Sequence, residues 1–135
     1  MYKADVQVRV RYAETDQMGY AYYGNYATYY EVARVEAMRQ AGFQYKKMEE
    51  EGVMMPVTEL HCKFIRPAKY DELLTVRVSI PSLPEMRMKF LYEVFNEQGI
   101  KLNQGETTLA FINKSTGRPC RAPGYLLELL KPHFE

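Results

Sequence analysis

Hydrophobic and polar residues alternate with a period of two in four stretches of the chain. These stretches run from Val6 to Tyr12 and over residues 60–64, 74–80 and 86–94. Alternation places apolar side chains on one face, so each stretch is predicted to be a half-buried strand. Asn96 to Gly99 has the composition of a hairpin turn, which predicts a fifth strand over about residues 101–113.

The only strong internal helix signal begins after Asn25 and ends before Gly42. Helical spacing relates Tyr26, Tyr29, Tyr30, Ala33, Ala37 and Ala41. Asn25 is a good N-cap because its side chain can accept a hydrogen bond from a backbone N–H one turn in. Gly42 suits the left-handed residue that closes a helix. Apolar residues on the opposite side predict a helix that is buried all round, with alanines that let a sheet approach closely: Ala27, Val32, Val35 and Met38.

The order of these elements predicts the fold class. One strand is followed by the long helix and then by four strands joined by short connections, with a short helical turn over 43–51 and a terminal helix over 122–131. Consecutive strands on short turns pair antiparallel. We therefore predict one α+β domain over residues 1–135, in which a curved antiparallel sheet wraps around one central helix.

Several apolar residues are predicted on the outer face of this sheet. They are Leu73, Leu91, Phe95, Leu109 and Phe111. Contiguous apolar patches are uncommon on the surface of soluble monomers. We therefore expect partner subunits, as a homodimer or a dimer of dimers.

Composition and charge exclude several functions. The net charge of +1 gives no electrostatic case for binding nucleic acid or an anionic membrane. The sequence lacks both a long apolar run for membrane insertion and the apolar region of a signal peptide, so we expect a cytoplasmic protein. Cys62 and Cys120 lack metal or redox spacing and are expected to be free thiols.

The candidate chemistry lies where the polar loop around Asp16 leads into the predicted helix. The first N–H groups of a helix have no partner within it and favour an anion or a developing oxyanion. Gly24 has no side chain, so a flat group such as a thioester could lie against the backbone before Asn25. Asp16 could then act as nucleophile or as general base for water. The alternative is that Asp16 caps a turn and Gly24 forms a tight corner.

The stretch YxETDxMGYxYYGNYxxYYExAR over residues 12–34 resembles the N-terminal signature of hotdog-fold acyl-CoA thioesterases of the hydroxybenzoyl-CoA thioesterase family. The matching residues are Tyr12, Glu14, Thr15, Asp16, Gly19, Tyr23, Asn25, Tyr26, Glu31 and Arg34. A second patch, residues 64–68 with Tyr70 and Asp71, is also similar to the family. The resemblance extends over nearly the whole chain and implies hydrolysis of an acyl-CoA or acyl-carrier-protein thioester, with no metal and no cofactor.

The resemblance also implies roles for individual residues. Asp16 matches the catalytic aspartate, and the backbone N–H of Tyr23, joined by that of Gly24, matches the donor that polarises the thioester carbonyl. Some relatives carry histidine at the position of Tyr23, so its phenol is an alternative participant. Together with Asn25, these residues form the expected substrate-binding set, and Arg66 is a candidate for binding the phosphates of CoA.

Other residues and functions have weaker support. Glu31 and Arg34 lie one helical turn apart and are expected to pair. A non-catalytic acyl-thioester-binding or scaffold protein on the same fold is the main alternative function. A dehydratase or hydratase of the same fold would rely on a histidine, and residues 12–42 contain none.

Overall fold

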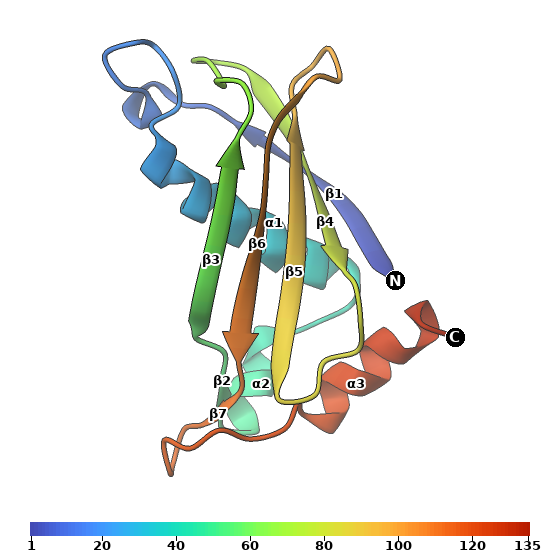
Figure 1. Cartoon of the computed structure of the whole chain (residues 1–135). Coiled ribbons are helices and arrows are strands. Elements are labelled where there is room, and N and C mark those ends of the chain that lie inside the picture. Colours follow the sequence, from blue (N-terminus) through green and yellow to red (C-terminus); the bar gives the residue numbers. More distant parts are fainter.

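A five-stranded antiparallel sheet forms the body of the protein (Figure 1). The structure is a computed structural model that describes residues 1–135. The strands lie in the order β1-β4-β5-β6-β3. Their bounds are Tyr2–Arg9 for β1, Leu73–Ile80 for β4, Arg87–Phe95 for β5, Lys101–Ala110 for β6 and Val57–Phe64 for β3. A separate two-stranded ladder joins β2 (Val53–Met54) to β7 (Ile112–Asn113).

The predicted alternation is confirmed in β1, β4 and β5, but the predicted half-burial of residues 60–64 is wrong, because β3 is an edge strand on which Leu60 and Phe64 are exposed. The alternation also misplaces the end of the first strand. In β4, the alternate residues from Leu74 to Ile80 are buried. Strand β1 ends at Arg9, and Tyr12 begins a 3₁₀ turn in which its side chain is exposed. The strand stops because the backbone N–H of Arg11 turns to the carboxylate of Glu14, at 2.9 Å.

The expectation that consecutive strands pair is right for two pairs and wrong for β3. Strand β4 pairs with β5 and β5 pairs with β6, but β3 pairs with β6 at the far edge of the sheet. The chain then crosses the sheet to β4, which lies beside β1. The N–H groups of Ile65 and Arg66 both donate to the carbonyl oxygen of Leu102, which fixes the start of this crossing on β6.

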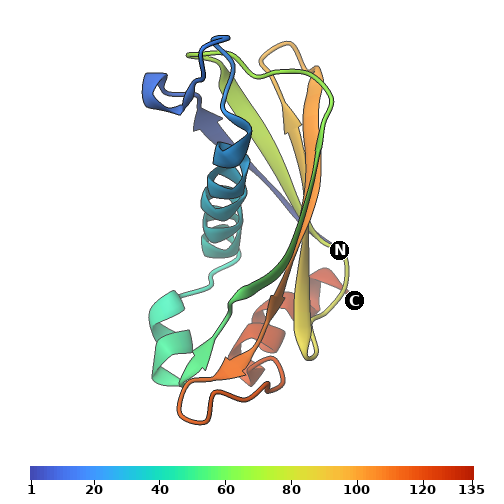
Figure 2. The same ribbon diagram turned by 60° about the vertical axis from the view of Figure 1, so that its left-hand side comes forward.

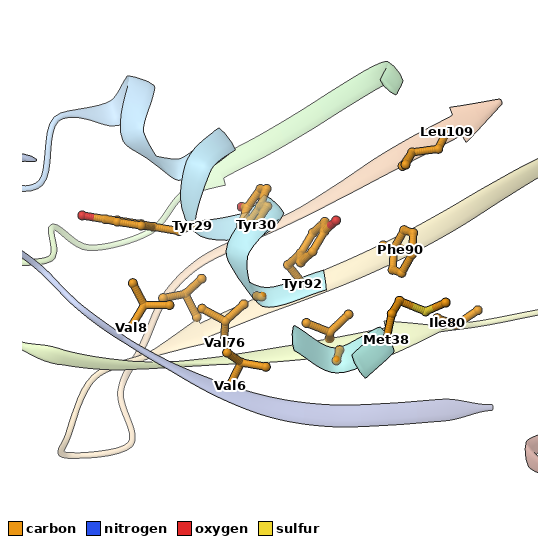
Figure 3. Packing of buried hydrophobic residues seen from close by; sticks show 14 of the residues in the cluster. Val6, Val8, Tyr29, Tyr30, Met38, Val76, Ile80, Phe90, Tyr92 and Leu109 are labelled. Atoms are coloured by element: carbon orange, nitrogen blue, oxygen red, sulfur yellow. The ribbon is translucent and has the colours of Figure 1, made fainter. Parts of the chain in front are cut away.

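Helix α1 (Tyr26–Gln40) lies against the concave face of the curved sheet (Figure 2). Ala33 and Ala37 are fully buried, so the expected close approach of sheet and helix is confirmed. Figure 3 shows how Tyr30 and Met38 on this side meet residues of β4, β5 and β6. The expectation of burial all round is wrong: Val32 is 44% exposed, because the sheet covers one side of the helix only.

The C-terminal end of α1 follows the prediction. Gly42 has a φ of +94°, in the left-handed region that favours glycine. Its N–H donates to the carbonyl oxygen of Arg39 at 2.9 Å, and the N–H of Phe43 donates to that of Met38 at 3.0 Å. This pair of bonds is a Schellman motif, which satisfies carbonyl groups at the end of the helix.

Two short helices follow the predicted positions. Helix α2 (Tyr45–Glu50) ends before Gly52, which has a positive φ. Helix α3 (Gly124–Leu130) follows Pro123 and buries Leu126 and Leu130 against the core. No helix of the structure combines the length and hydropathy needed to cross a membrane.

A polar layer crosses the core between α1 and the sheet. The ring of Tyr30 stacks on that of Tyr92, with centroids 4.2 Å apart. The Tyr30 hydroxyl donates to Oδ1 of Asn103. The hydroxyls of Tyr92 and Thr107 are hydrogen-bonded at 2.6 Å. Gly105 leaves room for this layer, since an added Cβ would lie 2.4 Å from the Tyr30 oxygen.

This polar layer explains an error in the predicted outer face. Leu73, Leu91 and Phe95 are half-buried, but Leu109 and Phe111 are almost fully buried and belong to the core. Strand β6 directs the polar Asn103 and Thr107 toward the helix, on the same side as Leu109. Polarity therefore does not distinguish the two faces of this strand.

Candidate active site

Glu14 joins the loop that carries Asp16 to the start of α1. Its carboxylate accepts hydrogen bonds from the backbone and guanidinium of Arg11 and from the hydroxyl of Tyr29, at 3.0 Å. Burial alone would raise the pKa of Glu14, but these hydrogen bonds outweigh that effect and lower it. Glu14 is therefore an ionised anchor. This anchoring role was not predicted from the sequence, although the Arg11-x-x-Glu14 spacing is a visible signal of it.

Asn25 occupies the predicted N-cap position but does not cap the helix. Its backbone is already helical, with φ −75° and ψ −14°, and its side chain makes no capping hydrogen bond. The amide Nδ2 instead donates to the carbonyl oxygen of Glu14 at 2.7 Å. A 3₁₀ turn over Tyr23–Asn25 precedes α1, which removes the extended conformation that an N-cap needs. Asn25 therefore fixes the loop against the helix.

Asp16 uses one carboxylate oxygen to hold its loop. Oδ1 accepts from the backbone N–H groups of Met18 and Tyr20, at 2.9 and 3.2 Å. The loop is closed by a bridge between Thr15 and Ala21 and by the Asp16 N–H, which donates to the Tyr20 carbonyl oxygen. Oδ2 makes no hydrogen bond to the chain. The aspartate thus holds the turn while its second oxygen stays available to a ligand.

The two sequence patches that carry the family resemblance meet in space. The N–H of Ala21 donates to the carbonyl oxygen of Ala68 at 2.8 Å, and Tyr20 forms an antiparallel bridge with Lys69. Arg66 precedes this contact and is exposed, and its backbone N–H is hydrogen-bonded to β6. The guanidinium of Arg66 forms no ion pair within the chain.

The turn before α1 presents two unpaired backbone donors. The N–H of Tyr22 donates to Glu14 and the N–H of Asn25 donates to Tyr22, but those of Tyr23 and Gly24 have no acceptor within the chain. A Cβ at Gly24 would lie 2.7 Å from Cε2 of Tyr22. The absence of a side chain at Gly24 therefore lets the Tyr22 ring lie against the turn. Both donors are at the positive end of the helical run that continues to Gln40.

The expected pairing of Glu31 with Arg34 is wrong. Neither residue takes part in an ion pair within the chain, whereas Arg39 pairs with Glu36 on the same helix. Arg34 instead turns toward the hydroxyls of Tyr45 and Tyr92. The sequence spacing allows the Glu31–Arg34 pair, but the two residues line a cavity beside the helix without forming an ion pair.

An antiparallel sheet wrapped around one helix is the architecture of the hotdog-fold thioesterases to which the chain is similar. The model of the thioesterase-like superfamily matches residues 10–130. The chain belongs to this superfamily, which confirms the family resemblance of its sequence.

Individual relatives agree with this assignment. A DHNA-CoA thioesterase from Staphylococcus aureus is 33% identical, with a TM-score of 0.87, over 100% of this chain and 97% of its own. The acyl-CoA thioester hydrolase YbgC of Escherichia coli O157:H7 is 28% identical over 86% of this chain and 87% of its own. A mutant 4-hydroxybenzoyl-CoA thioesterase in complex with 4-hydroxybenzoyl-CoA shares the fold, with a TM-score of 0.85. It is 18% identical, and the match covers 96% of this chain and 99% of its own.

Proposed function

We propose that the protein hydrolyses acyl-CoA thioesters at Asp16, releasing a carboxylic acid and the CoA thiol. The protein is an enzyme of the acyl-CoA thioesterase class, as its family and relatives indicate. One observation carries the assignment of the site: Tyr23 and Gly24 present unpaired backbone N–H groups at the start of the helical run, beside the loop of Asp16. These donors suit the oxyanion that forms when a thioester carbonyl is attacked.

The free oxygen of Asp16 supplies the attack in one of two ways. As a nucleophile, Oδ2 adds to the carbonyl carbon, the C–S bond breaks, CoA thiolate leaves, and water cleaves the mixed anhydride. As a general base, the carboxylate removes a proton from the water that adds to the carbonyl. The N–H groups of Tyr23 and Gly24 stabilise the oxyanion in both cases, and a donor of this kind contributes on the order of 10²–10³ in rate.

The substrate is an acyl group on CoA or on an acyl carrier protein. Named relatives act on DHNA-CoA or on acyl-CoA thioesters, which supports CoA as the carrier. Arg66 is exposed next to the contact between the Asp16 loop and residues 68–70, and it carries no ion pair. We assign its guanidinium to the phosphates of CoA, which arginine binds through a planar set of donors.

A non-catalytic acyl-thioester-binding or scaffold protein is the second candidate. It is favoured by the two hydrogen bonds that Asp16 Oδ1 accepts from backbone N–H groups, because a purely structural aspartate would make these bonds. Such a protein would bind acyl-CoA without releasing CoA. Thiol release from a panel of acyl-CoAs, measured with Ellman's reagent, separates the two functions.

We propose a homodimer as the smallest assembly, with a dimer of dimers built from it. Strand β3 is an unpaired edge, and its helix-facing residues Val57, Leu60 and Phe64 are about half exposed, at 46%, 47% and 52%. A long apolar edge strand is a site for pairing with another chain. Light scattering at micromolar concentration is expected to give at least twice the chain mass of 15.8 kDa. A mass equal to that of one chain would contradict the proposed assembly.

Two substitutions of Tyr23 test the role of the backbone donor. Tyr23→Phe keeps the N–H and should leave kcat/KM within about tenfold of wild type, whereas loss of a general acid would cost about 10²-fold or more. Tyr23→Pro removes the N–H. A folded proline variant should lose on the order of 10²–10³ in kcat. An inactive phenylalanine variant beside an active proline variant would assign the chemistry to the phenol; circular dichroism checks folding in both.

A further inference from the structure

A small cavity lies between α1, α2 and the helix-facing side of the sheet. Its volume is about 200 Å³, and most of its lining is apolar. The lining residues are Glu31, Arg34, Val35, Met38, Phe43, Tyr45, Met55, Phe90 and Leu109. An apolar cavity of about 150 Å³ can hold a benzene molecule. The cavity beside α1 therefore has room for the end of an acyl group but not for a long fatty chain.

Arg34 is the one basic residue of this lining, and Glu31 is its one acidic residue. Arg34 is half-buried and forms no ion pair with Glu31 or any other carboxylate, whereas Arg39 on the same helix pairs with Glu36. Its guanidinium lies by the hydroxyls of Tyr45 and Tyr92. Burial raises the pKa of both tyrosines, and the charge of Arg34 opposes that effect. A partly desolvated guanidinium without an anion is costly, so a ligand with a negative group would be stabilised here.

We infer that this cavity holds the far end of the acyl group and that Arg34 binds a terminal carboxylate there. The inference rests on the proposed function, because it places the thioester at Tyr23 and Gly24. A carboxylate fits the planar fork of arginine in a bidentate geometry. The substrate class is then the CoA monothioester of a dicarboxylic acid.

The length of α1 sets the length of the acyl chain. Arg34 follows Gly24 by ten residues, which is about 15 Å along a helix. Helical side chains lean toward the N-terminus, so a guanidinium lies roughly one turn, about 5 Å, closer. Bonds of about 1.5 Å advance an extended carbon chain by roughly 1.3 Å each. The remaining distance of about 10 Å corresponds to an acyl chain of about eight carbons.

An apolar wall is present along this path. The ring of Phe64 lies 6.3 Å from that of Tyr23 and 5.4 Å from that of Tyr26, by centroids. Leu60, two pleats further along β3, is 47% exposed. These side chains are on the side of β3 that faces the helix and would contact the methylene groups of an extended chain. The carboxylate at its end would then be the only polar group that needs a partner.

A matched pair of substrates tests the inference: suberoyl-CoA, with eight carbons and a terminal carboxylate, and octanoyl-CoA, with the same length and none. Wild type is expected to hydrolyse suberoyl-CoA with the higher kcat/KM. Arg34→Met should lower that value by about 10- to 100-fold, the usual effect of losing a hydrogen-bonded charge partner. The value for octanoyl-CoA should stay within about threefold, since a methyl end needs no cation. Arg39→Met is the control and should change neither value.

A second variant keeps the test valid if Arg34→Met does not fold. Arg34→Lys retains the charge without the planar fork, and it should give a preference between those of wild type and Arg34→Met. An equal effect of Arg34→Met on both substrates, or a wild-type preference for octanoyl-CoA, would overturn the inference and leave the proposed function standing. Hydrolysis of no acyl-CoA by wild type would overturn both.

Discussion

Gly105 is the position where the fold tolerates a side chain least. An alanine Cβ there would lie 2.4 Å from the hydroxyl oxygen of Tyr30 and 2.6 Å from the carbonyl oxygen of His61. The His61 carbonyl belongs to the neighbouring strand and cannot rotate away. Tyr30 would have to move, and its hydroxyl would leave Oδ1 of Asn103 without a donor in the core.

Two costs add up in the Gly105→Ala variant. Forcing an extra carbon into a packed core costs about 1–3 kcal/mol. A buried polar group that loses its partner costs about 1–3 kcal/mol more. The variant should therefore lose about 2–6 kcal/mol of unfolding free energy. With an unfolding entropy of about 2.1 cal/mol/K per residue over 135 residues, this corresponds to a fall in Tm of roughly 7–21 °C.

Calorimetry or thermal circular dichroism measures this fall against a glycine control. Gly124→Ala is suitable, because a Cβ there meets nothing within 4 Å and its φ is not in the left-handed region. The control should change stability by less than about 1 kcal/mol. A Gly105→Ala variant whose Tm lies within 2 °C of wild type would refute the packing argument. Such a small fall in Tm corresponds to about half a kcal/mol, which is less than either cost alone.

Two further predictions concern pH. The lowered pKa of Glu14 contributes stability that is present above its unfolded value of 4.5 and is lost as pH falls through the folded value. Glu14→Gln should therefore flatten the decline of Tm below pH 4.5. An unchanged decline would count against the role of Glu14 as an ionised anchor. Burial, with smaller effects of Cys62 and Glu72, raises the pKa of Tyr26 from 10.0 to about 12. About 3 kcal/mol of stability is therefore present below pH 10 and is lost as pH rises toward 12. Tyr26→Phe should resist alkaline unfolding in denaturant titrations better than wild type, and equal sensitivity would contradict the role of burial.

Local patterns in the sequence predict the elements well and their arrangement less well. The helix over residues 26–40 follows from spacing that each turn repeats, and its end follows from Gly42. The position of β3 beside β6 depends on a pairing across about 40–50 residues, which no local pattern encodes. Asn103 and Thr107 face the helix because Tyr30 and Tyr92 supply partners for them, and only the folded chain brings these residues together.

The candidate site divides in the same way. Asp16 and Gly24 could be found from the sequence, because a carboxylate loop before a helix start has a short-range signature. The hydrogen bond from Asn25 to Glu14 could not be found from the sequence, since the two residues are 11 positions apart and an N-cap was the simpler local solution. The partner of Arg34 was also mispredicted, because helical spacing says which residues can meet and not which way a side chain turns.

The most direct test of the account compares Asp16→Asn with Asp5→Asn in a thiol-release assay on one hydrolysed acyl-CoA. Asparagine keeps the shape of Asp16 and the acceptor for the N–H groups of Met18 and Tyr20, but it cannot attack or take a proton. Asp5 is a carboxylate on β1 that pairs with Arg77, and its substitution should leave the rate unchanged. We predict that Asp16→Asn lowers kcat by about 10²–10⁴-fold while the folded structure and the affinity for acyl-CoA persist. A folded Asp16→Asn variant that retains kcat within tenfold of wild type would contradict the assignment of Asp16 as the catalytic group.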